Sequence, residues 1–186
     1  MSRQYWSETL SWATADGTPV TNTTTETIIF PNVTIPANYM NDGRQIRIRA
    51  FGKYSTGTGP PTMIFSVRMG GVAGTLICKT AACTTVASVT NAGWDLDVVL
   101  GTRTNGSSGS VMGNGTLNLF AAVAGTVASA TGEGLLTPLM NGGVVTPAAA
   151  TVDLTIDQAL SLTMTWSASS TSHTVTGLNY TLESMN

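Results

Sequence analysis

Apolar and polar residues alternate with a period of two along much of this chain. Residues 44–54 are the clearest case, since one set of alternate positions is mainly apolar and the other set carries Arg47, Arg49, Phe51 and Lys53. Successive side chains of a β-strand point to opposite faces of its sheet. This segment is therefore predicted to be a strand with one face buried and the other in contact with solvent.

Similar short segments recur between clusters of Gly, Pro, Asn and Ser, a pattern typical of β-sandwiches and barrels. Clear alternation predicts strands at residues 63–69, 94–100, 160–166 and 178–182. Weaker alternation adds candidates at residues 6–14, 26–30, 75–78, 111–123 and 152–156. The pair Gly70-Gly71 follows the strand predicted at residues 63–69 and predicts a turn there.

About nine or ten strands are therefore expected, and no segment has a convincing helical period. Sheets of this number rarely stay flat and open, so the predicted fold is all-β, an antiparallel β-sandwich with jelly-roll-like connections. The 186 residues fit one domain. We expect that sandwich at 23–186, an N-terminal strand or arm at 1–22, and a Gly/Ala-rich excursion near 125–150 with room for a short strand or a helical turn.

Composition narrows the class of partner. Charged residues make up 10% of the chain, 42% are hydrophobic, and 32 are threonine, whereas an ordinary globular protein has roughly 25% charged residues. A net charge of −2 provides no positive field for a phosphate backbone, so no nucleic-acid partner is expected. Residues 1–9 lack the apolar run of a signal peptide, and no apolar run is long enough to span a membrane.

Catalytic chemistry has few candidate residues. A Ser-His-Asp triad would have to use His173, the one histidine, which is expected on a surface loop, and no G-x-S-x-G elbow is present to hold a serine. Asp95 and Asp97 lie about 7 Å apart on one strand face by strand rise, a spacing that an inverting glycosidase could use. Such acids usually form the solvated side of a strand, and Asp153 and Asp157 are no better placed. We expect no catalytic residues.

Two cysteines, Cys78 and Cys83, are separated by four residues. A structural zinc site normally needs four ligands, and His173 is the one further candidate of the usual His/Cys type. We therefore expect no metal and no cofactor. Two reduced thiols are the favoured interpretation, with a local disulfide open to them in oxidising surroundings.

Arg47, Arg49 and Lys53 form a basic stripe on one face of the predicted strand, and Arg44 and Arg68 are candidates to extend it. Three roles are open for the stripe. It could pair with the acids of residues 95–97, dock on an acidic partner surface, or protect a sheet edge from aggregation.

Large aromatic residues mark two candidate interfaces. Phe51 interrupts the basic stripe, which suggests that part of that face is covered. Tyr5, Trp6 and Trp12 fall within the first twelve residues, where most domains are polar and poorly ordered, and aromatic residues are enriched at interfaces. Because Trp6 and Trp12 share one face of an alternating segment, a first strand packed on its own core is the alternative.

Five segments resemble a recurrent block in structural proteins of tailed bacteriophages and prophages. They are residues 21–27 (TNTTTET), 35–38 (IPAN), 43–54 (GRQIRIRAFGKY), 91–94 (NAGW) and 157–166 (DQALSLTMTW). The resemblance runs from about residue 21 to the C-terminus and involves no catalytic motif. It implies a virion protein with a β-sandwich fold.

Capsid decoration (cement) proteins and tail or fibre components both use such folds. The resemblance does not fix which part of the virion holds the chain, and we expect a non-enzymatic cement protein, made in the host cytoplasm and carried on the capsid surface of the virion. There it would form a homotrimer and bridge subunits of the major capsid protein or other virion proteins. The alternative is a tail or fibre component whose loops bind a glycan or receptor.

Overall fold

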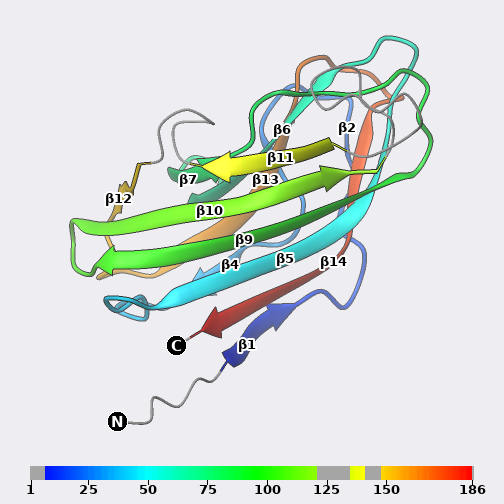
Figure 1. Ribbon diagram of the computed structural model, residues 1–186. Coiled ribbons are helices and arrows are strands. Elements are labelled where there is room, and N and C mark those ends of the chain that lie inside the picture. Colours follow the sequence, from blue (N-terminus) through cyan, green and yellow to red (C-terminus); the bar gives the residue numbers. More distant parts are fainter. Residues whose placement is uncertain (1–6, 121–134, 141–147, 186) are drawn as a thin grey trace.

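The computed structural model describes residues 7–120, 135–140 and 148–185, and these form an all-β protein. Two antiparallel sheets pack face to face, which confirms the predicted β-sandwich (Figure 1). In these ranges the structure has no helix that could cross a membrane.

The front sheet contains six strands in a continuous order and two short strands at its margins. In spatial order the six are β1 (Ser7–Trp12), β14 (Thr174–Met185), β5 (Gln45–Ser55), β9 (Ala92–Thr104), β10 (Gly109–Leu119) and β11 (Leu135–Met140). The short strand β2 (Val20–Thr21) pairs with β14, and β12 (Ala150–Val152) pairs with β10. Strands β10, β9, β5 and β14 lie side by side across the front of Figure 1.

The back sheet is smaller and is built around two long strands. Its order is β7 (Thr75–Lys79), β6 (Thr62–Met69), β13 (Gln158–Trp166) and β3 (Thr27–Ile28). The short strand β4 (Val33–Ile35) also pairs with β13, and β8 (Cys83–Thr84) pairs with β6. One backbone pairing, between Met140 of β11 and Lys79 of β7, joins this sheet to the front sheet along one margin.

The described ranges contain fourteen strands, against the nine or ten expected, and nine of the fourteen have five or more residues. They are β1, β5, β6, β7, β9, β10, β11, β13 and β14. The chain crosses between the sheets at β2–β3, β4–β5, β5–β6, β8–β9, β12–β13 and β13–β14. The predicted turn after β6 is also present, and both of its glycines, Gly70 and Gly71, have φ values (94° and 81°) that favour glycine.

The core lies between the two sheets and follows from the predicted alternation. Trp94 of β9 and Phe65 of β6 are fully buried, and their ring centroids are 5.0 Å apart in a tilted arrangement. Such a contact ties the front sheet to the back sheet, because each large apolar side chain contributes about 1.5–3 kcal/mol when it is buried. The inward residues of β5, from Ile46 to Tyr54, are buried on the same side.

Two predicted segments, the N-terminal strand or arm and the Gly/Ala-rich excursion, are described only in part. Strand β11 lies within the predicted excursion at 125–150 and β12 begins at its last residue, and most of its other residues are outside the described ranges. In the predicted N-terminal segment at 1–22, β1 and β2 both pair with β14, so the described part of this segment lies along the margin of the front sheet.

Candidate functional site

The outward face of the front sheet brings together side chains from four strands. In an antiparallel sheet, paired residues on neighbouring strands point to the same face. Each set of register partners on β14, β5, β9 and β10 therefore forms a row of neighbouring side chains across the sheet. Two such rows occupy the middle of this face.

The first row is centred on Phe51. Phe51 of β5 pairs with Asn179 of β14 on one side and with Asp95 of β9 on the other, and Asp95 pairs in turn with Asn118 of β10. The Asn118 amide nitrogen donates a hydrogen bond of 2.6 Å to Asp95 Oδ1. The Phe51 side chain is 49% exposed, although polar groups lie on both sides of it. An apolar ring thus stands in solvent within a polar row.

The second row is centred on Arg49. Arg49 pairs with Thr181 of β14 and with Asp97 of β9, and Asp97 pairs with Thr116 of β10. The Arg49 Nε atom is 3.9 Å from Asp97 Oδ2, close enough for an ion pair but too far for a direct hydrogen bond.

Arg47 makes the stronger bond to the same carboxylate. Its Nε donates to Asp97 Oδ1 at 2.8 Å, and its Nη2 donates to Oδ2. The hydrogen bonds from Arg47 lower the pKa of Asp97, against the effect of partial burial, and the charges of Arg47 and Arg49 add to this lowering. A general acid in a glycosidase needs a raised pKa, so Asp97 has the wrong electrostatics for that role.

A β-bulge in β14 sets the position of Asn179. The register of β14 against β5 shifts between Gly177 and Asn179, so that Leu178 is an extra residue. Bulges commonly change the direction in which the following side chains point. Here the shift places Asn179 outward beside Phe51, whereas Leu182 further along remains buried in the core.

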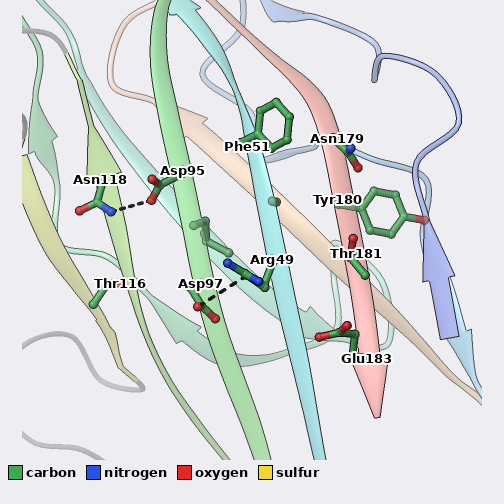
Figure 2. A pocket seen from close by; sticks show the side chains of 12 residues that line it. Arg49, Phe51, Asp95, Asp97, Thr116, Asn118, Asn179, Tyr180, Thr181 and Glu183 are labelled. Carbon is green, nitrogen blue, oxygen red and sulfur yellow. Dashed lines mark hydrogen bonds and ion pairs between the residues drawn. The ribbon is translucent and has the colours of Figure 1, made fainter. Parts of the chain in front are cut away.

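These rows form the floor and walls of an open groove of about 470 Å³. Its lining residues are Arg49, Ala50, Phe51, Asp95, Leu96, Asp97, Thr116, Asn118, Asn179, Tyr180, Thr181 and Glu183. Figure 2 shows the Asn118–Asp95 and Arg49–Asp97 contacts and places Asn179, Tyr180, Thr181 and Glu183 along β14. We refer to this feature as the outer groove.

A second feature is the margin of the sheet beside the outer groove. Strand β1 pairs with β14, and in the part of the chain that the structure describes no strand pairs with its other side. None of its six residues is fully buried, and Trp12 is 61% exposed. Trp12 pairs with Thr181, so it belongs to the outward face. We refer to this margin as the β1 edge.

The predicted interface residues therefore fall on one face of one sheet, as far as they are described. Arg47, Arg49 and Phe51 lie in the middle of it and Trp12 lies at its margin. Tyr5 and Trp6 lie outside the described residues. The described residues leave Phe51 half exposed.

The proposed extension of the basic stripe is wrong. Arg68 belongs to β6 of the back sheet, where it donates to both carboxylate oxygens of Glu26 at 2.6 and 2.8 Å. Arg44 precedes β5, and its guanidinium lies 4.3 Å from the centre of the Tyr39 ring. Alternation along a sequence assigns a residue to a face of its own strand, but not to one sheet or the other.

The expectation of a surface-loop histidine is also wrong. His173 is only 4% exposed, and its ring centroid lies 5.5 Å from that of Trp166. Its Nδ1 accepts a hydrogen bond of 3.2 Å from the backbone N–H of Gly57. Burial lowers the pKa of His173, which favours the neutral ring that can accept this bond. The ring therefore has a structural role in joining two loops.

The remaining candidates for chemistry also have structural partners. Cys78 and Cys83 are buried and are not joined in a disulfide, and burial raises the pKa of Cys78 to about 12, so its thiol is not a nucleophile at neutral pH. Asp153 accepts hydrogen bonds from Thr155, and Asp157 accepts one from the N–H of Ala37. Across the described ranges, no three His, Cys, Asp or Glu side chains are grouped so as to hold a metal ion.

Sequence reasoning missed the partners that complete the outer groove. Thr116, Asn118, Asn179, Thr181 and Glu183 were not singled out, although all but Glu183, which follows the strand predicted at 178–182, lie in a segment predicted as a strand. Their outward direction could have been inferred from alternation, except at the bulge. Their proximity to Phe51 and Arg49 could not, because it depends on strand order and register.

Comparisons of the chain with protein-family models, with curated proteins and with solved structures gave no match.

Proposed function

We propose that the chain is a non-enzymatic structural protein of a tailed-bacteriophage particle, which decorates the capsid and bridges neighbouring capsid subunits. It assembles as a homotrimer and binds the major capsid protein through the β1 edge. The resemblance of residues 21–186 to phage structural proteins supports the particle, and the β1 edge supports the mode of attachment.

The observation that carries this proposal is the exposed margin of the front sheet. A strand with one unpaired side offers backbone N–H and C=O groups to a strand of another chain, and proteins usually protect such margins with charges or cover. Strand β1 has one charged residue, Glu8, and ends in Trp12, whose side chain is 61% exposed. Burying a large aromatic side chain contributes roughly 2–3 kcal/mol, and such residues often dominate binding energy at interfaces.

The state of the reactive side chains supports a non-enzymatic role. His173 is buried against Trp166, the Cys78 thiol stays protonated, and the Asp97 carboxylate is held in an ion pair. Each of these groups has a structural partner or a pKa unsuited to general acid–base or nucleophilic work.

The test is the location of the protein in its own particle. Purified particles of the phage that encodes the chain are separated into heads and tails, and each fraction is probed with an antibody against the chain. We expect the protein in the head fraction, and we expect sedimentation of the purified chain to give the mass of a trimer. Detection in tails alone would replace the capsid proposal with a tail or fibre component, and absence from both fractions would refute a virion role.

A further inference from the structure

We propose that the outer groove binds a neutral oligosaccharide, with the Phe51 ring as the platform on which a sugar stacks. This inference does not rest on the location of the protein in a particle. The groove and the β1 edge adjoin at Trp12. The residues that support a sugar site, Phe51, Asp95 and Asn118, lie on strands further from β1.

The aromatic platform is the first observation. Phe51 is 49% exposed and lies in a row whose other members are Asn179, Asp95 and Asn118. A pyranose ring has a face made of C–H groups, which packs against an aromatic ring, and a rim of hydroxyl groups, which needs polar partners. A half-exposed ring set among amides and carboxylates matches both requirements.

The polar partners next to Phe51 are already oriented. The Asn118 amide is hydrogen-bonded to Asp95 at 2.6 Å, so two planar groups from neighbouring strands are held in fixed positions at one side of the ring. A carboxylate accepts hydrogen bonds, whereas an amide both donates and accepts. Because a sugar hydroxyl also does both, this pair can bind adjacent hydroxyls without ordering new side chains.

The balance of charge selects a neutral ligand. On this face Arg47 and Arg49 lie beside Asp97, and the groove also contains the carboxylates of Asp95 and Glu183. Lys53, two residues after Phe51 on the same strand face, brings the count to three cations against three anions, and Arg47 and Arg49 both contact the same carboxylate. A polyanion such as a nucleic acid or a sulfated glycan would find no surplus of positive charge here.

The size and shape of the groove favour a chain of sugars over a single ring. Four strands spaced about 4.8 Å apart span roughly 15 Å, and the groove of about 470 Å³, whose lining comes from four strands, is open to solvent. A protein partner is a weaker match, because protein interfaces are depleted in Asp and Glu, whereas Asp95 and Asp97 occupy the middle of this face.

The test uses the purified full chain and an array of short neutral oligomers of glucose, galactose, mannose and N-acetylglucosamine. Sialylated and sulfated oligosaccharides on the same array form the acidic arm. Titration calorimetry with the best neutral oligomer then compares wild type with Phe51→Ala, Phe51→Trp and Asn118→Ala. The control is Ile156→Ala, because Ile156 is 55% exposed and lies outside the groove.

We expect Phe51→Ala to raise Kd at least about tenfold, equivalent to about 1.4 kcal/mol, and Asn118→Ala to raise it less. Phe51→Trp should retain binding, and Ile156→Ala should bind as wild type does. The Phe51 and Ile156 variants should melt as wild type does, since these side chains are exposed. Asn118→Ala should stay folded but melt somewhat lower, because it loses the hydrogen bond to Asp95. The proposal is refuted if no neutral oligomer binds, if only acidic glycans bind, or if Phe51→Ala binds equally well. It is also refuted if the Phe51 and Asn118 variants lose attachment to particles but keep sugar binding, which would make the face a protein interface.

Discussion

The strictest steric requirement near the outer groove lies directly beneath it, at Gly52 of β5. A Cβ atom at this position would lie 2.1 Å from the carbonyl oxygen of Thr176 and 2.6 Å from Cζ2 of Trp94. Both neighbours are fixed by the sheet and the core. We expect Gly52→Ala to lower the free energy of unfolding by about 1–3 kcal/mol, the usual cost of overpacking, as measured by urea denaturation.

Gly101 of β9 provides the matched control for this substitution. It also lies in a strand of the front sheet, but a Cβ added there would meet no atom within 4 Å. Gly101→Ala should leave stability unchanged or raise it slightly, because alanine loses less conformational entropy on folding. Equal effects of the two substitutions would show that close packing at Gly52 does not matter.

His173 gives the fold a defined response to pH. Burial lowers its pKa in the folded state, so the unfolded chain binds a proton more readily than the folded protein does. Stability that depends on the neutral ring is therefore complete above the unfolded pKa of about 6.5 and declines as the pH falls below it. We expect the melting temperature to decrease between pH 7.5 and pH 5.5, and His173→Asn to reduce this decrease. A wild-type melting temperature that is constant over this range would contradict the role of His173.

At the level of single residues, the sequence predicts correctly those properties that depend on one strand alone, such as the face to which a side chain points. Alternation alone assigned Arg47, Arg49 and Phe51 to one face, and the structure places them there. It failed for Arg68 and His173, whose surroundings depend on packing between segments far apart in the chain. A lone histidine among serines is indistinguishable in sequence from a solvated one, and only the fold brings Trp166 and Gly57 to it.

Pairs of strands are held by ion pairs that differ in burial. Glu26 and Arg68 join the segment before β3 to β6, and both side chains are 21% exposed, whereas Arg47 and Asp97 are 34% and 37% exposed. Glu26 also accepts a hydrogen bond from Thr163 of β13. Burial opposes the charge on Glu26, but the bonds from Arg68 and Thr163 outweigh this effect, and its pKa is lowered.

This difference predicts unequal costs for removing each carboxylate. Asp97→Asn should cost at most about 1 kcal/mol, since solvent screens a pair that is more than one-third exposed. Glu26→Gln should cost more, about 1.5–3 kcal/mol, the range for hydrogen bonds to charged groups. Urea denaturation at neutral pH measures both costs. Because the pKa values of Asp97 and Glu26 are both lowered, the contribution of each carboxylate to stability should be lost as the pH falls through the acidic range below about 4.5. Equal costs of the two substitutions at neutral pH would contradict this ranking.

Whole strands were predicted where alternation continued for long enough. The segments predicted at 44–54, 63–69 and 160–166 match β5, β6 and β13 within two residues at each end. The two- and three-residue strands β2, β4 and β8 are too short to show a period. Neither the strand order nor the bulge at Leu178 can be read from alternation, and for this reason the outer groove could not be assembled from sequence.

At the scale of the whole molecule, the β1 edge is separate from the core that holds the two sheets together. Among the described residues, the first member of the buried core is Val20, and Leu10 and Ala13 pack against the core only in part. The core itself connects β5, β9, β10 and β14 to β6 and β13. Strand β1 thus adds backbone hydrogen bonds to β14 and covers little apolar surface, which fits a contact element better than a structural one.

Deletion of residues 1–12 tests this separation. The deletion removes β1 and the hydrogen bond of 2.7 Å between the hydroxyls of Ser11 and Tyr180, and it uncovers one side of β14. Because the buried core is untouched, the shortened chain should stay folded, with a melting temperature a few degrees below that of the full chain. If β1 and Trp12 form the contact with the capsid, the shortened chain should fail to bind particles or to form trimers, and Trp12→Ala in the full chain should weaken both without unfolding it. The free energy of unfolding of a domain totals about 5–15 kcal/mol. If the deletion removed a large share of it, β1 would instead belong to the core. A shortened chain that stays folded and still binds particles as a trimer would move the attachment site to another surface, with the outer groove, centred on Phe51, as the next surface to test.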